Sequence, residues 1–198
     1  MVKEELYVFD GELRSRLGVF CGVDEAGRGP LAGPVCCAAV ILKDESRFDW
    51  LDDSKKVTKS RREELYGEIT AQAEAWHVEL IDNDTIDEIN ILEATMLGMK
   101  KCIEALGCGA AAIDGNRAPK TASECVTVVK GDAKSASIAA ASILAKVTRD
   151  RFMDALAEKY PQYGFEKHRG YPTKAHYEAI RQYGITEFHR KSFLKKIH

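Results

Sequence analysis

Hydrophobic positions along the chain follow two different periods, which predict both strands and helices. Apolar or alternating runs predict five strands, at residues 17–23, 35–42, 76–81, 110–113 and 126–129. Helices are predicted at 61–73, 135–158 and 173–183. Apolar residues three and four positions apart predict a longer helix between a cap at Asp84 or Thr85 and a stop at Gly107. The order ββ, α, β, α, β, β, α and a helical tail indicates an α/β fold with a mixed sheet flanked by helices.

Signals at the element ends refine this picture. The first two strands are so close in sequence that we expect an antiparallel pair, joined by a glycine-rich break at residues 27–30. Ser60 and Glu63 form a capping box that predicts the start of the next helix. The small residues at 139–142 predict a helix that packs closely against the sheet.

Length and composition place the chain among ordinary globular proteins. Its 198 residues suit one domain with a small appendage, and 45% are hydrophobic. The longest apolar run, residues 34–42, is too short to cross a membrane, and residues 1–10 lack the apolar stretch of a signal peptide. The six cysteines form no CxxC pair, so we interpret them as buried thiols in a reducing compartment. We therefore expect a cytoplasmic protein.

Charge is distributed unevenly, although the net charge is only −2. Residues 150–198 hold ten Lys and Arg against six Asp and Glu, so the preceding body is acidic. Such a division suits a protein that gathers metal ions in one place and phosphates in another. A solvated helix face would give similar counts, so the division alone does not decide between the two.

Carboxylates follow three of the predicted strands. Asp24 and Glu25 come after the first strand, Asp114 after the fourth, and Asp132 three residues after the fifth. If these strand ends lie side by side, the acids meet at one rim of the sheet, where only cations relieve their repulsion. Oxygen ligands select hard ions such as Mg²⁺ or Mn²⁺, and four acids can hold two of them for phosphodiester hydrolysis. Taken singly, each aspartate could equally be an ordinary strand-end or turn residue.

A glycine–arginine–glycine loop follows the carboxylate pair at once. Gly27 and Gly29 would let the backbone approach a ligand closely, and Arg28 offers a planar fork for phosphate. Glycine-rich hairpin turns are common, so the tripeptide gains meaning only from its position beside Asp24 and Glu25.

Motifs along the chain resemble those of the ribonuclease HII family, the type 2 ribonucleases H. The segment GVDEAGRGPLAGPV at residues 22–35 matches the signature of that family. Further matches run in order at residues 53–56, 86–92, 114–116, 130–132, 139–147, 168–173 and 189–193. The resemblance therefore covers nearly the whole chain.

The resemblance implies a ribonuclease H-like fold, with a catalytic domain at residues 1–155 and a helical C-terminal segment at 156–198 that contributes to substrate binding. It implies an endoribonuclease that cuts the RNA strand of RNA–DNA hybrids. It also implies incision 5′ to single ribonucleotides in duplex DNA, which leaves 3′-hydroxyl and 5′-phosphate ends. The partners implied are these nucleic acids, with no membrane, and we expect a monomer. Residues 193–198 do not match a clamp-binding motif, and a sliding clamp stays an open question.

The resemblance also assigns roles to residues of this chain. The four metal-binding and catalytic acids fall on Asp24, Glu25, Asp114 and Asp132. Gly27, Arg28 and Gly29 would read the ribose 2′-hydroxyl, and Tyr171 would stack on the next sugar. Without the resemblance, Tyr171 would be interpreted as a packed loop aromatic. We expect two Mg²⁺ or Mn²⁺ ions, with Asp24 as the bridging ligand because it lies deepest.

Basic residues complete the expected site. Arg28 and Lys55 would contact phosphates, although as bare sequence they could be solvated cations. His168 and His189 lie in basic stretches without ligand spacing, so we interpret them as phosphate-side or structural residues and not as metal ligands.

Three alternatives remain. A type 3 ribonuclease H shares the core but usually carries an extra N-terminal domain, for which residues 1–21 leave no room. A resolvase or integrase of the same superfold would cut four-way junctions. A non-catalytic nucleic-acid-binding module would bind hybrids without cutting them.

Overall fold

A computed structural model of the chain describes residues 1–194. The expectation about a clamp-binding motif at 193–198 therefore falls largely outside the described residues. The strands are β1 (Cys21–Ala26), β2 (Val35–Ile41), β3 (Ala75–Ile81), β4 (Ala110–Asp114) and β5 (Glu124–Val128). The helices are α1 (Glu4–Leu17), α2 (Lys59–Gln72), α3 (Asn83–Leu106), α4 (Ala136–Lys159), α5 (Phe165–His168) and α6 (Lys174–Tyr183). Short 3₁₀ turns lie at Gly131–Ala133, Pro161–Tyr163 and Lys191–Phe193.

The five strands form one mixed sheet in the order β3-β2-β1-β4-β5. β1 pairs antiparallel with β2, as expected from their short connection, and parallel with β4. This α/β architecture with a mixed sheet confirms the predicted fold class. β1 is the central strand, and its first four residues, Cys21 to Asp24, are buried.

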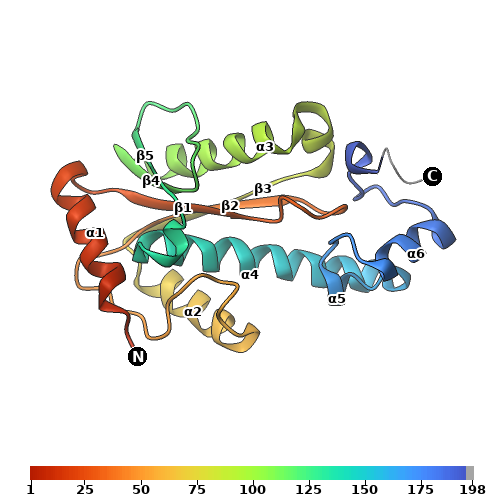
Figure 1. Cartoon of the computed structure of the whole chain (residues 1–198), viewed down its shortest axis with the longest axis horizontal. Coiled ribbons are helices and arrows are strands. Elements are labelled where there is room, and N and C mark those ends of the chain that lie inside the picture. Colours follow the sequence, from red (N-terminus) through yellow and green to blue (C-terminus); the bar gives the residue numbers. More distant parts are fainter. Residues whose placement is uncertain (195–198) are drawn as a thin grey trace.

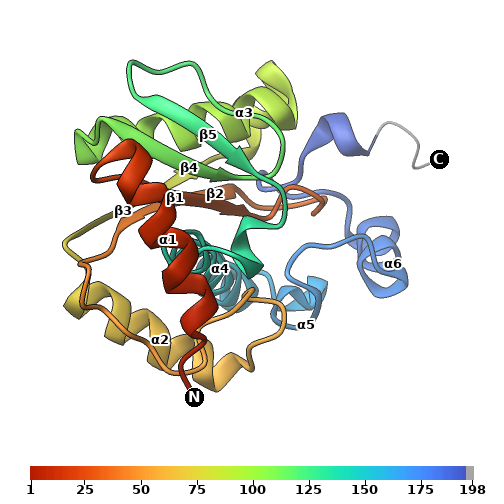
Figure 2. The same cartoon turned by 60° about the vertical axis from the view of Figure 1, so that its left-hand side comes forward.

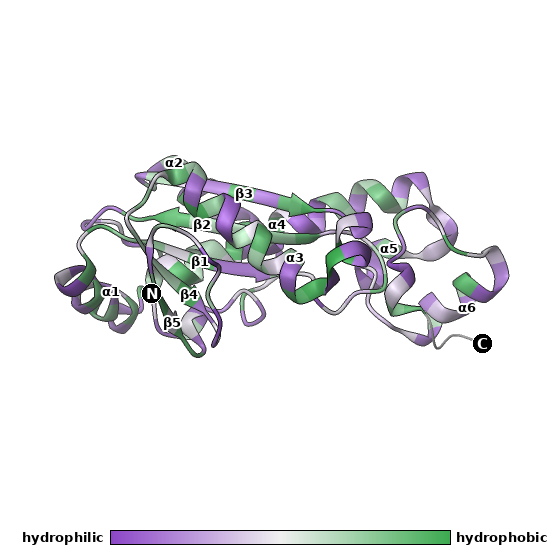
Figure 3. Ribbon diagram, turned by 90° about the horizontal axis from the view of Figure 1, so that it is seen from above, coloured by the Kyte–Doolittle hydropathy of each residue, from purple (hydrophilic) through white to green (hydrophobic). Residues whose placement is uncertain are grey.

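Helices cover both faces of the sheet (Figures 1 and 2). Alternate residues of β2 face opposite layers: Cys37 packs with Met99 and Ile103 of α3, whereas Cys36 packs with the small residues of α4. β2 is buried along its whole length, and Figure 3 shows it as mostly hydrophobic. Within the described residues, no helix is long and apolar enough to cross a membrane.

The close approach of α4 to the sheet is the feature that positions the site. A Cβ atom built on Gly22 would lie 2.2 Å from the carbonyl carbon of Ser137, so only glycine fits there. The small residues of α4 at 139–141 are buried in the cluster that holds Cys36, Ala38 and Val40 of β2, as the sequence predicted. Ser135 caps the start of α4, since its hydroxyl accepts a hydrogen bond from the N–H of Ile138.

Several elements differ from expectation. Helix α1 was not predicted, and it includes Leu17, which we assigned to the first strand. α2 is capped by Thr58 and not by Ser60, and α3 is capped by Asp82. α3 also breaks at Asn90, whose side-chain oxygen accepts from the N–H groups of Leu92 and Glu93.

The C-terminal segment lies beyond the end of the sheet, against the far end of α4 (Figure 1). Its core includes Phe165, Ile180 and Tyr163, which pack with Met153 and Leu156 of α4. It also returns to the loop between β1 and β2, since Ala32 and His189 form an isolated bridge. This segment therefore touches both α4 and the loop that follows β1.

Candidate active site

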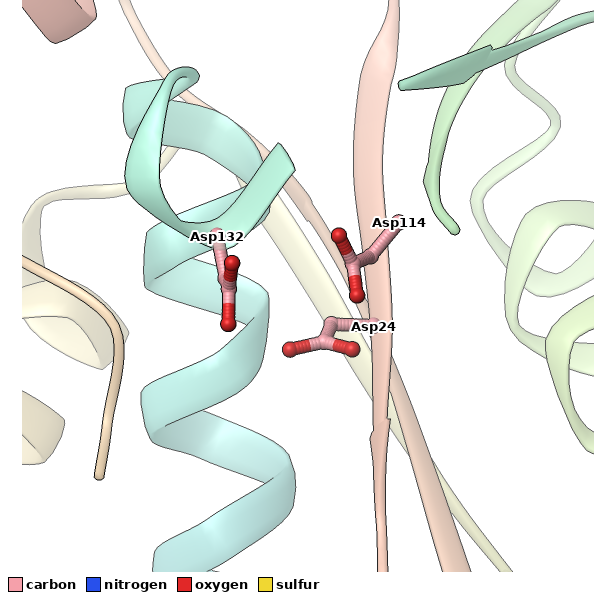
Figure 4. Close-up of side chains that lie close together, drawn as sticks. All are labelled: Asp24, Asp114 and Asp132. Atoms are coloured by element: carbon pink, nitrogen blue, oxygen red, sulfur yellow. The ribbon is translucent and has the colours of Figure 1, made fainter. Parts of the chain in front are cut away.

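Three aspartates converge between β1, β4 and the start of α4 (Figure 4). Asp24, Asp114 and Asp132 each offer a carboxylate oxygen, and these oxygens lie within 4.8 Å of one another. Asp24 and Asp132 are buried, and Asp114 is partly buried. Segments far apart in the sequence thus bring three of the four predicted acids together.

The pairing of β1 with β4 explains why two of these aspartates meet. The two strands are parallel, with Val23 beside Ile113, so the next residues, Asp24 and Asp114, are neighbours. Asp114 ends β4 as predicted, but Asp24 is the fourth residue of β1 and does not follow its end. This position within the central strand accounts for the deep burial of Asp24.

Asp132 comes from a different kind of element. It lies in the 3₁₀ turn Gly131–Ala133, which follows β5 and leads into α4. The turn is tied to the strand ends because the N–H of Gly131 donates to Oδ1 of Asp114 at 2.6 Å. Lys130 adopts a left-handed conformation, with φ of 57°, that redirects the chain toward the cluster.

The electrostatics of the cluster favour a bound cation. Burial, followed by the charges of Glu25 and Asp114, raises the pKa of Asp24 well above its usual range. Burial and the charge of Asp114 also raise the pKa of Asp132. A divalent cation would relieve this repulsion, and an oxygen-only donor set of this size matches the preference of Mg²⁺ or Mn²⁺. The three aspartates therefore fit a hard divalent metal.

Glu25 lies beside this cluster and not within it. Its backbone N–H donates to Oδ1 of Asp24 at 2.7 Å, and its carboxylate is 3.5 Å from Nη1 of Arg28. Burial raises the pKa of Glu25, with Arg28 opposing this effect and Asp114 adding to it. Its role as a metal ligand stays a prediction.

Lys55 reaches the cluster from the loop that precedes α2. Its Nζ atom is 3.6 Å from Oδ2 of Asp132 and 3.7 Å from Oδ1 of Asp53. Burial alone would lower the pKa of Lys55, but these carboxylates raise it overall. The side chain is nevertheless 79% exposed, so its ammonium group stays accessible to a phosphate.

The loop at residues 27–29 lies directly after Glu25. Gly27 has a φ of +93°, which favours glycine, and a Cβ atom there would lie 1.9 Å from Nε of Arg149. Arg28 and Gly29 are exposed. Among the described residues, none of the three backbone N–H groups donates a hydrogen bond. Beside the acidic cluster, this loop therefore holds three N–H groups without an acceptor, two of them on exposed residues.

Tyr171 lies next to this loop although it comes from the C-terminal segment. A Cβ atom on Gly29 would be 3.5 Å from the ring of Tyr171, which is 42% exposed. The N–H of Tyr171 donates to the carbonyl of His168 at 2.8 Å, and this bond holds the turn. The predicted loop residues and the predicted tyrosine thus lie side by side.

A pocket of about 290 Å³ joins these residues and adds several that sequence reasoning missed. Gly27, Arg28, Gly29, Lys55 and Tyr171 line it, together with Ser54, Ser142, Lys146 and Arg149. Ser142, Lys146 and Arg149 recur at intervals of three or four on α4, so one helix face supplies all three. That spacing was readable in the sequence, but nothing there showed which face of the helix meets the loop.

Of the two interpretations given to His189, a phosphate-side residue or a structural one, its surroundings favour the structural one. It is fully buried, and its Nε2 atom is 3.1 Å from Nε2 of His176. His168 is partly buried, and its Nε2 atom lies 2.9 Å from the carbonyl oxygen of Tyr163.

Comparison with known proteins decides the family. A sequence model described as Ribonuclease HII matches residues 21–196. The chain belongs to the ribonuclease HII family. Curated Ribonuclease HII proteins are similar throughout: that of Polynucleobacter asymbioticus is 52% identical over 179 residues, covering 87% of this chain and 91% of its own. That of Caldicellulosiruptor saccharolyticus is 53% identical, covering 89% and 87%.

Solved structures agree with this assignment. RNase HII of Archaeoglobus fulgidus, solved in complex with PCNA, is 30% identical with a TM-score of 0.73, covering 87% of this chain and 93% of its own. Ribonuclease H2 of Pyrococcus horikoshii is 27% identical with a TM-score of 0.70, covering 87% and 92%. Bst-RNase HIII in complex with Mn²⁺ is 19% identical with a TM-score of 0.60, covering 86% and 65%, and shows the shared fold alone.

Membership of the family establishes the class of enzyme. The chain is a type 2 ribonuclease H, a nuclease that acts on the RNA of RNA–DNA substrates, in a metal-dependent family. The type 3 enzyme, the resolvase or integrase and the non-catalytic binding module are therefore set aside.

Proposed function

We propose that the chain hydrolyses the RNA strand of RNA–DNA hybrids and also incises 5′ to single ribonucleotides embedded in duplex DNA. The products would carry 3′-hydroxyl and 5′-phosphate ends. One observation carries the proposal: the three-aspartate cluster lies next to a loop whose three N–H groups are free. The 2′-hydroxyl is the group that distinguishes RNA from DNA, so a sensor for it belongs beside the hydrolytic centre.

Asp24, Glu25, Asp114 and Asp132 are the proposed catalytic and metal-holding residues. Asp24, Asp114 and Asp132 would hold two Mg²⁺ or Mn²⁺ ions between them, with Asp24 as the central ligand and Asp114 and Asp132 on either side of it. Bound there, the ions would supply the positive charge that lowers the pKa of an attacking water molecule and stabilises the departing 3′-oxygen. Glu25 would orient the site from beside Asp24, where Arg28 holds its carboxylate.

The remaining pocket residues would bind and align the substrate. The N–H groups of Gly27, Arg28 and Gly29 would read the 2′-hydroxyl, because a glycine backbone can approach a sugar closely. Tyr171 would stack on the sugar of the following deoxynucleotide. Arg28 and Lys55 would contact phosphates, since both side chains are exposed and lie beside the acids.

The division of the chain follows from these roles. Residues 1–155 would form the catalytic domain, and residues 156–198 would contribute to substrate binding through Tyr171. Gly27, Arg28 and Gly29 line the same pocket as Tyr171. A single protomer therefore holds all the residues proposed to bind the substrate, and it would act as a monomer.

Cleavage of an end-labelled duplex with one ribonucleotide tests the proposal. We expect a single cut 5′ to the ribonucleotide in Mg²⁺ or Mn²⁺, and no cut in an all-DNA duplex of the same sequence. Asp24→Asn and Asp114→Asn should each reduce cleavage to below a few per cent of wild type. A cut at another position, or appreciable activity of either variant in saturating Mg²⁺, would contradict it.

A further inference from the structure

Two buried arginines lie beneath the loop at residues 27–29. Arg190 is 0% exposed and Arg149 is 1% exposed. Within residues 1–194, neither guanidinium forms an ion pair with a carboxylate, and the hydrogen-bond acceptors of both are backbone carbonyls. Burying a charge with neutral partners alone is costly. Their positions therefore call for an explanation beyond packing.

Arg190 binds the loop through all three nitrogens of its side chain. Nη2 donates to the carbonyl of Gly27 at 2.7 Å, and Nη1 donates to that of Arg28 at 2.9 Å. Nε donates to the carbonyl of Gly33 at 2.9 Å, near the other end of the connection between β1 and β2, which spans residues 27–34. The backbone N–H of Arg190 also donates to Leu31. One residue of the C-terminal segment thus fixes the loop at both ends.

These bonds determine where the N–H groups of the loop point. In a trans peptide the carbonyl of one residue and the N–H of the next point in opposite directions. Every described peptide bond is trans. When Arg190 draws the carbonyls of Gly27 and Arg28 inward, the N–H groups of Arg28 and Gly29 must face away from it. Those are two of the three N–H groups that lack an acceptor.

Arg149 extends this arrangement toward Tyr171. Its Nε atom donates to Pro34 at 3.0 Å and Nη2 donates to Ala32 at 3.2 Å, while Nη1 donates to the carbonyl of Arg169 at 3.1 Å. The loop N–H of Leu31 donates to Gly170, the residue before Tyr171. Burial lowers the pKa of Arg190 to about 9, which is consistent with a charge held in a dry site.

We propose that Arg190 is a positioning residue for ribose recognition, which holds the carbonyls of Gly27 and Arg28 so that the following N–H groups face the 2′-hydroxyl. The inference rests on the proposed function, because it assigns the loop that reads the sugar. Arg190 touches neither the substrate nor the aspartates in this role. It acts through the backbone of the loop.

Arg190→Lys is the variant that tests this role. Lysine keeps the positive charge, but its single ammonium group cannot hold three carbonyls in the planar fork of a guanidinium. The matched control is Arg181→Lys, because Arg181 is exposed on α6 in the same segment. Both would be made in an Asp24→Asn background, so that duplexes are bound in Mg²⁺ without being cut.

The measured quantity is the preference ratio, defined as the Kd for an all-DNA duplex divided by the Kd for the same duplex with one ribonucleotide. We expect Arg190→Lys to lower this ratio by about tenfold, the effect of one hydrogen bond. The Kd for all-DNA should change little, and the Arg181→Lys control should keep the parent ratio. A purely structural role would instead weaken binding of both duplexes together and leave the ratio unchanged, which would overturn the inference.

A second variant covers the case in which lysine at this position prevents folding. Arg190→Ala leaves a buried space that methylguanidinium can fill. We expect this ion, well below denaturing concentrations, to restore the preference ratio along with the Tm. Recovery of the Tm without recovery of the ratio would overturn the inference. A parent protein that binds both duplexes equally would contradict the proposed function itself, which separates the two failures.

Discussion

His189 and His176 form a hydrogen bond between their Nε2 atoms at 3.1 Å, and both rings are fully buried. The N–H of Thr186 donates to Nδ1 of His189, so the proton of that neutral ring is on Nε2. Nε2 of His176 then accepts, and its Nδ1–H donates to the carbonyl of Tyr171 at 3.0 Å. The chain of bonds requires both imidazoles to be neutral, and it ends on the turn that carries Tyr171.

Acid should therefore destabilise the fold through this pair. Burial lowers the pKa of both His176 and His189 to about 4, and in His189 the neighbouring ring adds to the effect. The pKa of an unfolded histidine is near 6.5. The stability that the two neutral rings contribute is therefore fully present above that pH, and it is lost as the pH falls toward 4. Each ring should therefore lower the free energy of unfolding by about 2 kcal/mol as the pH falls from 7.5 to 5.

Urea unfolding at several pH values checks this expectation. The double variant His176→Gln, His189→Gln should show a smaller loss of unfolding free energy between pH 7.5 and pH 5 than wild type. His77→Gln, at a partly exposed position outside this pair, serves as the control and should keep the wild-type slope. Equal slopes in all three proteins would contradict the prediction.

The buried charge of Asp24 leads to a second prediction, on stability without metal. Asp24 is 4% exposed, and its carboxylate lies beside Glu25 and Asp114, which disfavour its charged form. Asp24→Asn removes that repulsion, so the free energy of unfolding in EDTA should rise by about 1 kcal/mol. The Tm in EDTA should rise by a few degrees as a result. Mg²⁺ or Mn²⁺ should raise the Tm of wild type but have much less effect on the variant.

Thermal unfolding with and without Mn²⁺ measures both effects. Asp44→Asn is the control, because Asp44 is exposed beyond the end of β2 and pairs with Arg14 of α1 and not with the cluster. It should leave the response to Mn²⁺ unchanged. A wild-type Tm that is insensitive to both ions would show that the three aspartates hold no divalent metal.

The sequence placed most residues of the candidate site correctly relative to one another, because they lie on strongly patterned elements. Residues of β1 and β4 are apolar until their aspartates, and parallel pairing then brings Asp24 and Asp114 together. Asp132 was placed near the strand ends, although it lies in a turn whose shape depends on the left-handed Lys130. Such a conformation in a lysine is set by tertiary contacts and cannot be inferred from composition.

Helix α1 was missed for a physical reason. Its buried face consists of Leu6, Asp10 and Leu13, so a charged residue interrupts the apolar stripe. Asp10 is buried because its carboxylate accepts hydrogen bonds from Ser135 and Ser137 at the start of α4. The partners lie about 125 residues away, and no local pattern reveals them. The same holds for Arg190, whose acceptors come from the other end of the chain.

Lys55 should contribute one phosphate contact, and its neighbour provides the control. Lys55 points toward Asp132, whereas Nζ of Lys56 lies 3.5 Å from Asp52 instead. Lys55→Ala should weaken hybrid binding and reduce the slope of log K against log salt by about one. Lys56→Ala should leave the slope unchanged. Fluorescence titrations at several salt concentrations give this slope, and identical slopes for the two variants would contradict the assignment.

The two glycines of the loop should respond differently to alanine. Gly27→Ala forces a Cβ atom onto Arg149 at a positive φ, so the unfolding free energy should fall by about 2 kcal/mol or more. Gly29→Ala meets only the ring of Tyr171 at an ordinary 3.5 Å, so the Tm should stay near that of wild type. Its methyl group would nevertheless occupy the exposed side of the loop, and cleavage should fall. Thermal unfolding and cleavage assays on both variants separate the two effects.

Tyr171 should act through its ring and not through its hydroxyl. Among the described residues the hydroxyl has no hydrogen-bond partner, while the ring lies over Gly29 with the guanidinium of Arg149 5.9 Å from its centre. Tyr171→Phe should therefore keep kcat/KM within about threefold of wild type. Tyr171→Ala should lower kcat/KM by about 10- to 100-fold, since one stacking contact contributes roughly 1–3 kcal/mol.

Neither change should alter the Tm much, because the ring is half exposed. Tyr183→Ala removes another exposed tyrosine of the same segment and should leave cleavage unaffected. Single-turnover cleavage of a duplex with one ribonucleotide, measured for the three variants, distinguishes the roles. If Tyr171→Phe lost as much activity as Tyr171→Ala, the hydroxyl would be the functional group, and the proposed stacking on the sugar would be wrong.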